Sequence, residues 1–158
     1  FPTQTVLPAS LKRFGNKTIE TIELKGHTDS DLVVFDPDSR VMWAGGLVFY
    51  KRIVTTPHAK LKPWIESLKK LQAMQPKVVV PSHGPVSWGS EAIDQTLDYL
   101  TWLDKRLTDA ANMGEEMNDV MKKGAPERFQ NFAAYPAEFY RNVTNLYPVY
   151  EKAALGGF

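Results

Sequence analysis

The sequence contains no cysteine. Disulfide bonds, thiolate zinc sites and a cysteine nucleophile are therefore excluded, and a bound metal must be held by histidine, aspartate or glutamate. No apolar run approaches the roughly 20 residues that span a bilayer, so we expect no membrane partner. The 19 basic and 18 acidic residues nearly cancel and do not form blocks. Because nucleic-acid binding needs a broad basic surface, we expect no DNA or RNA partner either.

The sequence also lacks an initiator methionine and a charged region followed by an apolar region at its start. We therefore expect either a processed mature protein or a piece of a longer one. A chain of 158 residues is long enough to bury about 70% of its unfolded surface without disulfides or structural metals.

Short apolar segments predict an α/β sheet in the first part of the chain. Residues 1–12 carry two prolines and are expected to be irregular, and a Gly-Asn turn at 14–17 predicts a hairpin. A helix is expected from Lys60, where apolar residues recur every three or four positions. The expected strands, of which the second and third look buried on both faces, are 18–24, 32–35, 41–44 and 77–80.

From Ser90 onward the apolar pattern is helical. A long helix is expected up to Gly114, followed by a shorter helix that stops at 124–126, and a final helix that Pro148 kinks or ends. We therefore divide the chain into a mostly β part at 1–90 and a helical extension at 91–158 packed on it.

Two of the three histidines follow expected strands. His27 lies in a loop with Asp29 and Asp31, whose carboxylates could orient an imidazole, and His83 follows the strand at 77–80. Both positions are also compatible with loop histidines that only shape turns. Together with the Gly45-Gly46 pair, they predict that three strand ends bring their loops to one edge of the sheet.

Other polar and aromatic residues favour ordinary structural roles. His58 lies in a polar loop and is expected to be exposed, and Asp36 and Asp38 flank a proline in a turn. The Gly45-Gly46 pair lacks the rest of a phosphate loop. Five aromatic residues are expected to line helix packing: Tyr99, Trp102, Tyr140, Tyr147 and Tyr150.

Three segments together resemble the second half of the metallo-β-lactamase superfamily: 26–32 (Gly-His-Thr-Asp-Ser-Asp-Leu), 43–49 (Trp-Ala-Gly-Gly-Leu-Val-Phe) and 79–85 (Val-Val-Pro-Ser-His-Gly-Pro). With the helical tail at 140–143, they are most similar to the zinc metallohydrolases of quinoprotein relay systems. The resemblance implies half of an αββα sandwich and a hydrolase that binds one or two zinc ions when complete. It further implies that His27 and His83 are metal ligands, and it implies a periplasmic or secreted location. Of the two carboxylates near His27, we expect Asp29 to support the ligand, ahead of Asp31.

The sequence departs from that family in two places. Its H-x-H-x-D-H motif is absent, and Gly46 stands where the family has a metal-bridging aspartate or cysteine. We therefore expect the isolated chain to bind zinc weakly or not at all, to lack activity, and to pair with its missing N-terminal half or a second copy. The alternatives are a non-catalytic binding or dimerisation module, and an α/β domain whose histidines only shape loops. The small-molecule substrate is not identified.

Overall fold

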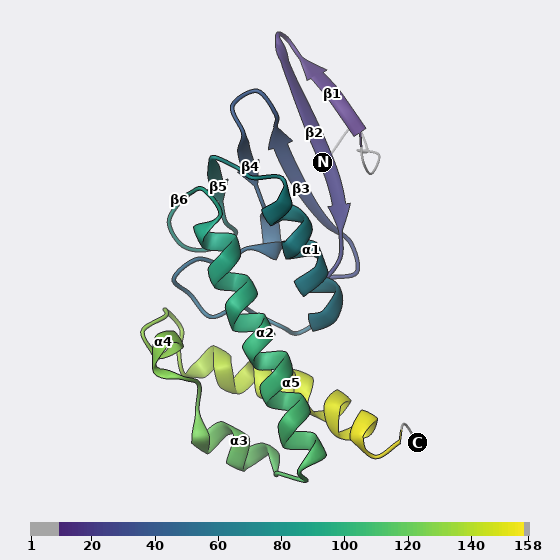
Figure 1. Ribbon diagram of the computed structural model, residues 1–158, viewed down its shortest axis with the longest axis vertical. Coiled ribbons are helices and arrows are strands. Elements are labelled where there is room, and N and C mark those ends of the chain that lie inside the picture. Colours follow the sequence, from purple (N-terminus) through teal and green to yellow (C-terminus); the bar gives the residue numbers. More distant parts are fainter. Residues whose placement is uncertain (1–9, 157–158) are drawn as a thin grey trace, which may run out of the picture.

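The computed structural model describes residues 10–156 and has one mixed sheet with helices against one of its faces (Figure 1). Neighbouring strands are antiparallel except β4 and β5, which run parallel and are connected through helix α1 (Leu61–Ala73). The expected α/β class is confirmed. In their order across the sheet, the strands are β1 (Ser10–Phe14), β2 (Lys17–Leu24), β3 (Asp31–Asp36), β4 (Val41–Trp43), β5 (Val78–Val80) and β6 (Ser87–Trp88).

Strands β1 and β2 form a hairpin with a two-residue turn. Phe14 pairs with Lys17, and Gly15 between them has a φ of 59°, which glycine adopts without steric cost. The predicted turn is therefore confirmed. The prediction of an irregular start is wrong for residues 10–12, which pair with β2, and its remainder at 1–9 lies outside the described residues.

The sheet is buried on one face. Val33 and Met42 have no exposed surface, whereas Leu32 and Trp43 next to them are 45% and 43% exposed. The prediction that β3 and β4 are buried on both faces is therefore wrong, because the helices of the described chain cover one side (Figure 1). Apolar composition alone could not show this, since an apolar residue reads the same whether or not its face is covered.

The last third of the chain is helical, as predicted. Its helices are α2 (Glu91–Asn112), α3 (Met117–Lys123), α4 (Glu127–Gln130) and α5 (Ala137–Ala154). Pro148 does not end α5, which continues through it to Ala154. The short β6 and α4 were not predicted, because two and four residues are too few to establish a period. None of the described helices is long and apolar enough to cross a bilayer.

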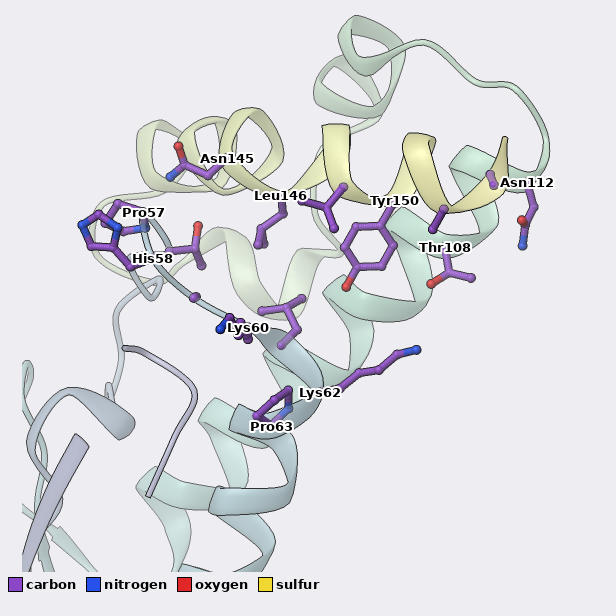
Figure 2. Close-up of a pocket in the computed structure, with 16 residues that line it drawn as sticks. Pro57, His58, Lys60, Lys62, Pro63, Thr108, Asn112, Asn145, Leu146 and Tyr150 are labelled. Atoms are coloured by element: carbon purple, nitrogen blue, oxygen red, sulfur yellow. The ribbon is translucent and has the colours of Figure 1, made fainter. Parts of the chain in front are cut away.

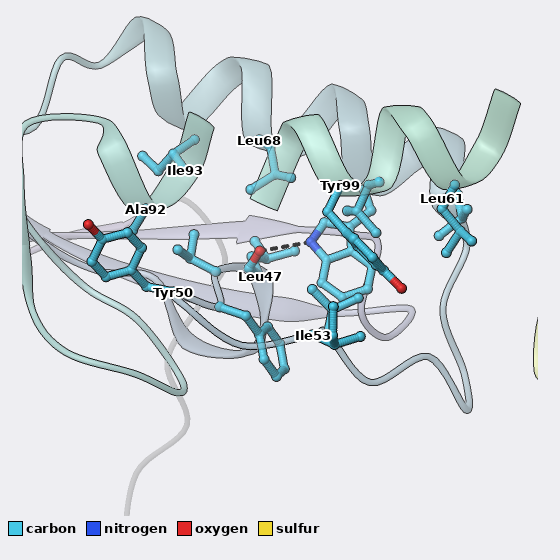
Figure 3. Packing of buried hydrophobic residues seen from close by; sticks show 14 of the residues in the cluster. Leu47, Tyr50, Ile53, Leu61, Leu68, Ala92, Ile93 and Tyr99 are labelled. Carbon is cyan, nitrogen blue, oxygen red and sulfur yellow. Dashed lines mark hydrogen bonds between the residues drawn. The ribbon is translucent and has the colours of Figure 1, made fainter. Parts of the chain in front are cut away.

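One hydrophobic core joins the sheet to the helices (Figure 3). Trp64 of α1 lies at its centre without exposed surface, and its indole Nε1 donates a hydrogen bond of 2.8 Å to the carbonyl of Leu47. Leu47 belongs to a short 3-10 helix, η1 (Gly45–Leu47), that follows β4. Helix α2 packs against α1 with its first half, and α5 packs against α2 and α3. The core therefore fixes the loop after β4 relative to α1.

Candidate functional site

The C-terminal ends of β2, β4 and β5 lie at the same edge of the sheet. β2 and β4 are each antiparallel to β3, and β5 is parallel to β4, so these three strands share one direction. Their loops carry His27, the Gly45-Gly46 pair and His83. The structure thus brings together the three segments that the sequence singled out, and open α/β sheets commonly bind ligands at such an edge.

Gly26 sets the path of the loop that carries His27. It has a φ of 152°, and a Cβ at this position would lie 2.3 Å from the Cα of Trp64, so glycine is required by the close approach of two backbones. The carbonyl of Gly26 also accepts a hydrogen bond of 2.8 Å from the Lys60 amide. His27 consequently lies with its ring centroid 5.4 Å from the Trp64 ring in an edge-on contact. Helix α1 therefore supports one side of the imidazole.

Asp31 and Asp29 have different surroundings. Asp31 is buried, with Oδ1 3.7 Å from His27 Nδ1, and it accepts hydrogen bonds from the Thr28 amide (3.0 Å) and hydroxyl (2.9 Å). Asp29 is exposed and pairs with Lys60 at 2.6 Å; the hydrogen bond from the Lys60 ammonium lowers the pKa of Asp29. The structure therefore places Asp31 beside the imidazole and turns Asp29 toward α1.

Phe49 joins the two histidines. Its ring stacks on His83 with centroids 4.9 Å apart and planes 6° apart, and its centroid lies 6.0 Å from that of His27. The backbone holds this arrangement, because the Tyr50 amide donates to the His83 carbonyl (2.9 Å) and the Ser82 amide to the Val48 carbonyl (2.8 Å). The sequence pattern did not identify Phe49 as a site residue, since a buried aromatic after a strand normally belongs to the core.

Gly46 makes room for His27. A Cβ on Gly46 would lie 2.5 Å from His27 Nδ1, well inside van der Waals contact. The imidazole therefore occupies the space into which a side chain at position 46 would project. An aspartate at this position requires the His27 ring to move, so the two residues are structurally coupled.

The described residues do not form a complete metal site. No group of three or more His, Asp or Glu side chains within residues 10–156 is arranged to hold an ion. His27 nevertheless has the environment of a metal-binding histidine, because a carboxylate lies near Nδ1 while Nε2 has a long contact of 3.4 Å with the Thr55 hydroxyl. Catalytic zinc normally takes three protein ligands, so His27 and His83 alone could not complete such a centre.

A buried asparagine, which sequence reasoning missed, supports the loop beside His27. Asn142 of α5 donates hydrogen bonds to the Val54 carbonyl (3.0 Å) and the Tyr99 hydroxyl (2.9 Å), and it accepts one from the Thr56 hydroxyl (2.8 Å). Thr55, between the two loop residues, is the one that contacts His27. The helical extension is therefore bonded to the loop that lines the candidate site. No short motif marks this residue, because its partners are far away in the sequence.

The other candidate residues lie away from His27 and His83. His58 is exposed, as expected. Asp36 closes the turn after β3, where hydrogen bonds from the Ser39 and Lys17 side chains lower its pKa to about 2. Tyr99 and Tyr147 are buried between helices, which agrees with the predicted packing role, while Tyr140 is 42% exposed.

The comparisons with known proteins agree on one family. Residues 2–83 match the family model of the metallo-beta-lactamase superfamily. The chain is 22% identical over 168 residues to a linear primary-alkylsulfatase of Pseudomonas sp. (strain ATCC 19151), an alignment that covers 99% of this chain and 32% of the sulfatase. It is also similar in structure to a metallo-beta-lactamase of Pontibacter korlensis, with a TM-score of 0.57 and 31% identity, and to the metallo-beta-lactamase IND-7, with a TM-score of 0.56 and 24% identity.

The chain spans about half of each of these lactamases and about a third of the sulfatase. The lactamase alignments cover 63% and 64% of this chain and 49% of each lactamase. The expected fold class, half of a metallo-β-lactamase sandwich with a helical extension, agrees with these matches. The finer resemblance to quinoprotein relay metallohydrolases stays a prediction, as do the metal-binding roles of His27 and His83.

Proposed function

Because this chain belongs to the metallo-beta-lactamase superfamily, we propose that it is the C-terminal half of a metal-dependent hydrolase in which His27 and His83 bind the metal. The observation that carries the proposal is the convergence of these two histidines at one sheet edge, where both contact the ring of Phe49. Asp31 is the orienting carboxylate of the proposal, because it is buried beside His27, whereas Asp29 is paired with Lys60.

The proposed metal is zinc, with its remaining ligands supplied by a part of the protein outside this chain. Zinc held there would activate a water molecule and polarise an oxygen of the substrate. The residues of this chain would hold the ligands in place: Asp31 fixes the His27 ring, Phe49 stacks on His83, and Gly46 leaves space for His27. The isolated chain would consequently be inactive.

The uncovered face of the sheet supports a missing partner layer. Val34, Trp43 and Val80 are aligned across β3, β4 and β5, and Trp88 aligns with Val78 at the end of the same face. Trp43 is 43% and Trp88 77% exposed in the described chain. Large apolar patches of this kind are normally covered in an interface. We propose that the rest of the same protein covers this face, in the manner of a second sheet layer.

The proposed substrate class is a sulfate ester with an alkyl chain. The similarity to the linear primary-alkylsulfatase extends over 99% of this chain and therefore includes the helical extension, whereas the lactamase similarities cover less than two thirds. A zinc centre that polarises a carbonyl oxygen can equally polarise a sulfate oxygen. The helical extension is thus the part of the chain that favours the sulfatase comparison.

Elemental analysis of zinc tests the proposal. The intact protein is expected to contain zinc, and the chain of 158 residues to contain little or none. In the intact protein, His27→Ala and His83→Ala should each lower the zinc content, while His58→Ala, an exposed histidine outside the site, should not. Unchanged zinc in both of the first two variants would refute their role as ligands.

A second candidate is a module that has kept the fold and lost the chemistry. Gly46 favours this module, because glycine has no side chain that could bridge two metal ions and the His27 ring occupies the space of such a side chain. The module is excluded if the intact protein hydrolyses alkyl sulfates and if His27→Ala and His83→Ala each abolish this activity. Zinc-free intact protein without sulfatase activity would support it.

A further inference from the structure

A groove of about 720 Å³ lies between the loop before α1 and the C-terminal helix α5 (Figure 2). Its volume is within the range of about 300–1,000 Å³ that is typical of sites for small molecules. One wall consists of Leu61 and Pro63 at the start of α1, and the opposite wall of Leu146, Val149 and Ala153 on α5. These walls are apolar, and the side chain of Val149 is 66% exposed.

The charged side chains that line the groove are those of Lys60 and Lys62. His58, Lys60 and Lys62 line it, and no aspartate or glutamate is found among its lining residues in the described chain. Lys60 is paired with Asp29 at 2.6 Å, whereas Lys62 forms no ion pair within residues 10–156. In Figure 2 the Lys62 side chain extends from the start of α1 and lies below Thr108. The groove thus combines apolar walls with an uncompensated positive charge.

The groove and the candidate metal site share one loop. Thr55 contacts His27, while the next residues, Thr56 and Pro57, line the groove. The Thr56 hydroxyl is bonded to Asn142 in α5, so the loop is held between both features. A ligand in the groove would lie on the far side of the loop from the imidazole.

We propose that this groove binds an anionic amphiphile, with its alkyl chain between α1 and α5 and its head group near Lys62. Apolar walls match the alkyl chain, and the basic rim matches the anionic head. The choice of ligand rests on the proposed function, because an alkyl sulfate has this chemistry. The site is distinct from the histidine pair and would concentrate such molecules beside it.

Titration of the intact protein with alkyl sulfates, from hexyl to dodecyl and below their micelle concentrations, tests the proposal. Isothermal calorimetry is expected to show one molecule bound per chain, with affinity rising about fourfold for each added methylene that the walls bury. The alcohol of the same chain length should bind more weakly. Affinity independent of chain length, or equal binding of alcohol and sulfate, would overturn the proposal.

Substitutions in the groove wall and at Lys62 locate the binding. Ala153→Trp fills the groove from α5 and should abolish binding. If this variant does not fold, Val149→Asp replaces it, because a negative charge on the same wall should also abolish binding of an anion. Lys62→Glu should weaken binding about fivefold, while Lys69→Glu, an exposed lysine of α1 outside the groove, should not. Full affinity in both wall variants would place the ligand elsewhere.

Three further outcomes separate this proposal from the proposed hydrolase function and from other occupants of the groove. Groove binding should persist in the His27→Ala protein and after removal of metal, so failure of the proposed hydrolase would leave it intact. Affinity that falls as protein concentration rises would show that a second copy occupies the groove. Absence of binding until a covering segment of the intact protein is removed would show that this segment occupies it. Either of these last two results would overturn the proposal that the groove binds an amphiphile.

Discussion

Replacement of Asn142 by alanine should destabilise the protein strongly. The side chain has no exposed surface and makes three hydrogen bonds, to the Val54 carbonyl, the Thr56 hydroxyl and the Tyr99 hydroxyl. Alanine removes the partner of all three buried groups at once. A buried polar group left without a partner costs about 1–3 kcal/mol, and water entering the cavity recovers part of this. We therefore expect a loss of about 3–5 kcal/mol in the free energy of unfolding.

Equilibrium urea unfolding measures this loss. With a slope of about 2 kcal/mol per molar, the midpoint should fall by about 1.5–2.5 M. Thr56→Val removes a single bond with little change of shape and should cost about 1–2 kcal/mol. Asn145→Ala, at an exposed position of the same helix, is the matched control and should change stability by less than about 0.5 kcal/mol.

The reasoning is refuted if Asn142→Ala and Asn145→Ala unfold at the same urea concentration. A double substitution at Asn142 and Thr56 gives an internal check. Because the two residues share one bond, the double variant should lose less stability than the two single losses added together. Strict additivity would show that the bond is not formed in solution.

Three further predictions concern a glycine, a carboxylate and the uncovered sheet face. Gly26→Ala should prevent correct folding, as judged by circular dichroism, because its Cβ would lie 2.3 Å from the Trp64 backbone; Gly15→Ala, with no atom within 4 Å, should cost only about 1–2 kcal/mol for its left-handed backbone. The pKa of Asp36 is lowered from 3.8 to about 2, so its contribution to stability is complete above about pH 4 and is lost as the pH falls toward 2. Asp36→Asn should therefore flatten the pH dependence of the urea midpoint in that window, and an unchanged slope would refute it. Trp88→Ser should reduce self-association of the isolated chain in light scattering if its exposed sheet face is the contact, and unchanged association would exclude that face.

Periodicity and turn chemistry in the sequence determined most of the secondary structure. The Gly15-Asn16 turn, α1 and the long α2 could be predicted because each depends on local preferences and a regular apolar pattern. The sequence also indicated that the loops of His27 and His83 meet, since both follow strands of one sheet. Helix α5 continues through Pro148, so of the two predicted outcomes the proline does not end it; packing against α2 and α3 supports the helix on both sides of this residue.

Tertiary structure decided the features that depend on distant contacts. Which aspartate lies beside His27 follows from the fold, because Thr28 fixes Asp31 whereas Lys60 draws Asp29 away. The exposed second face of the sheet, the Asn142 network and the groove beside α5 likewise arise between segments far apart in the chain. Gly46 shows the difference most clearly. The sequence identified a missing side chain, and the structure shows that His27 occupies its space.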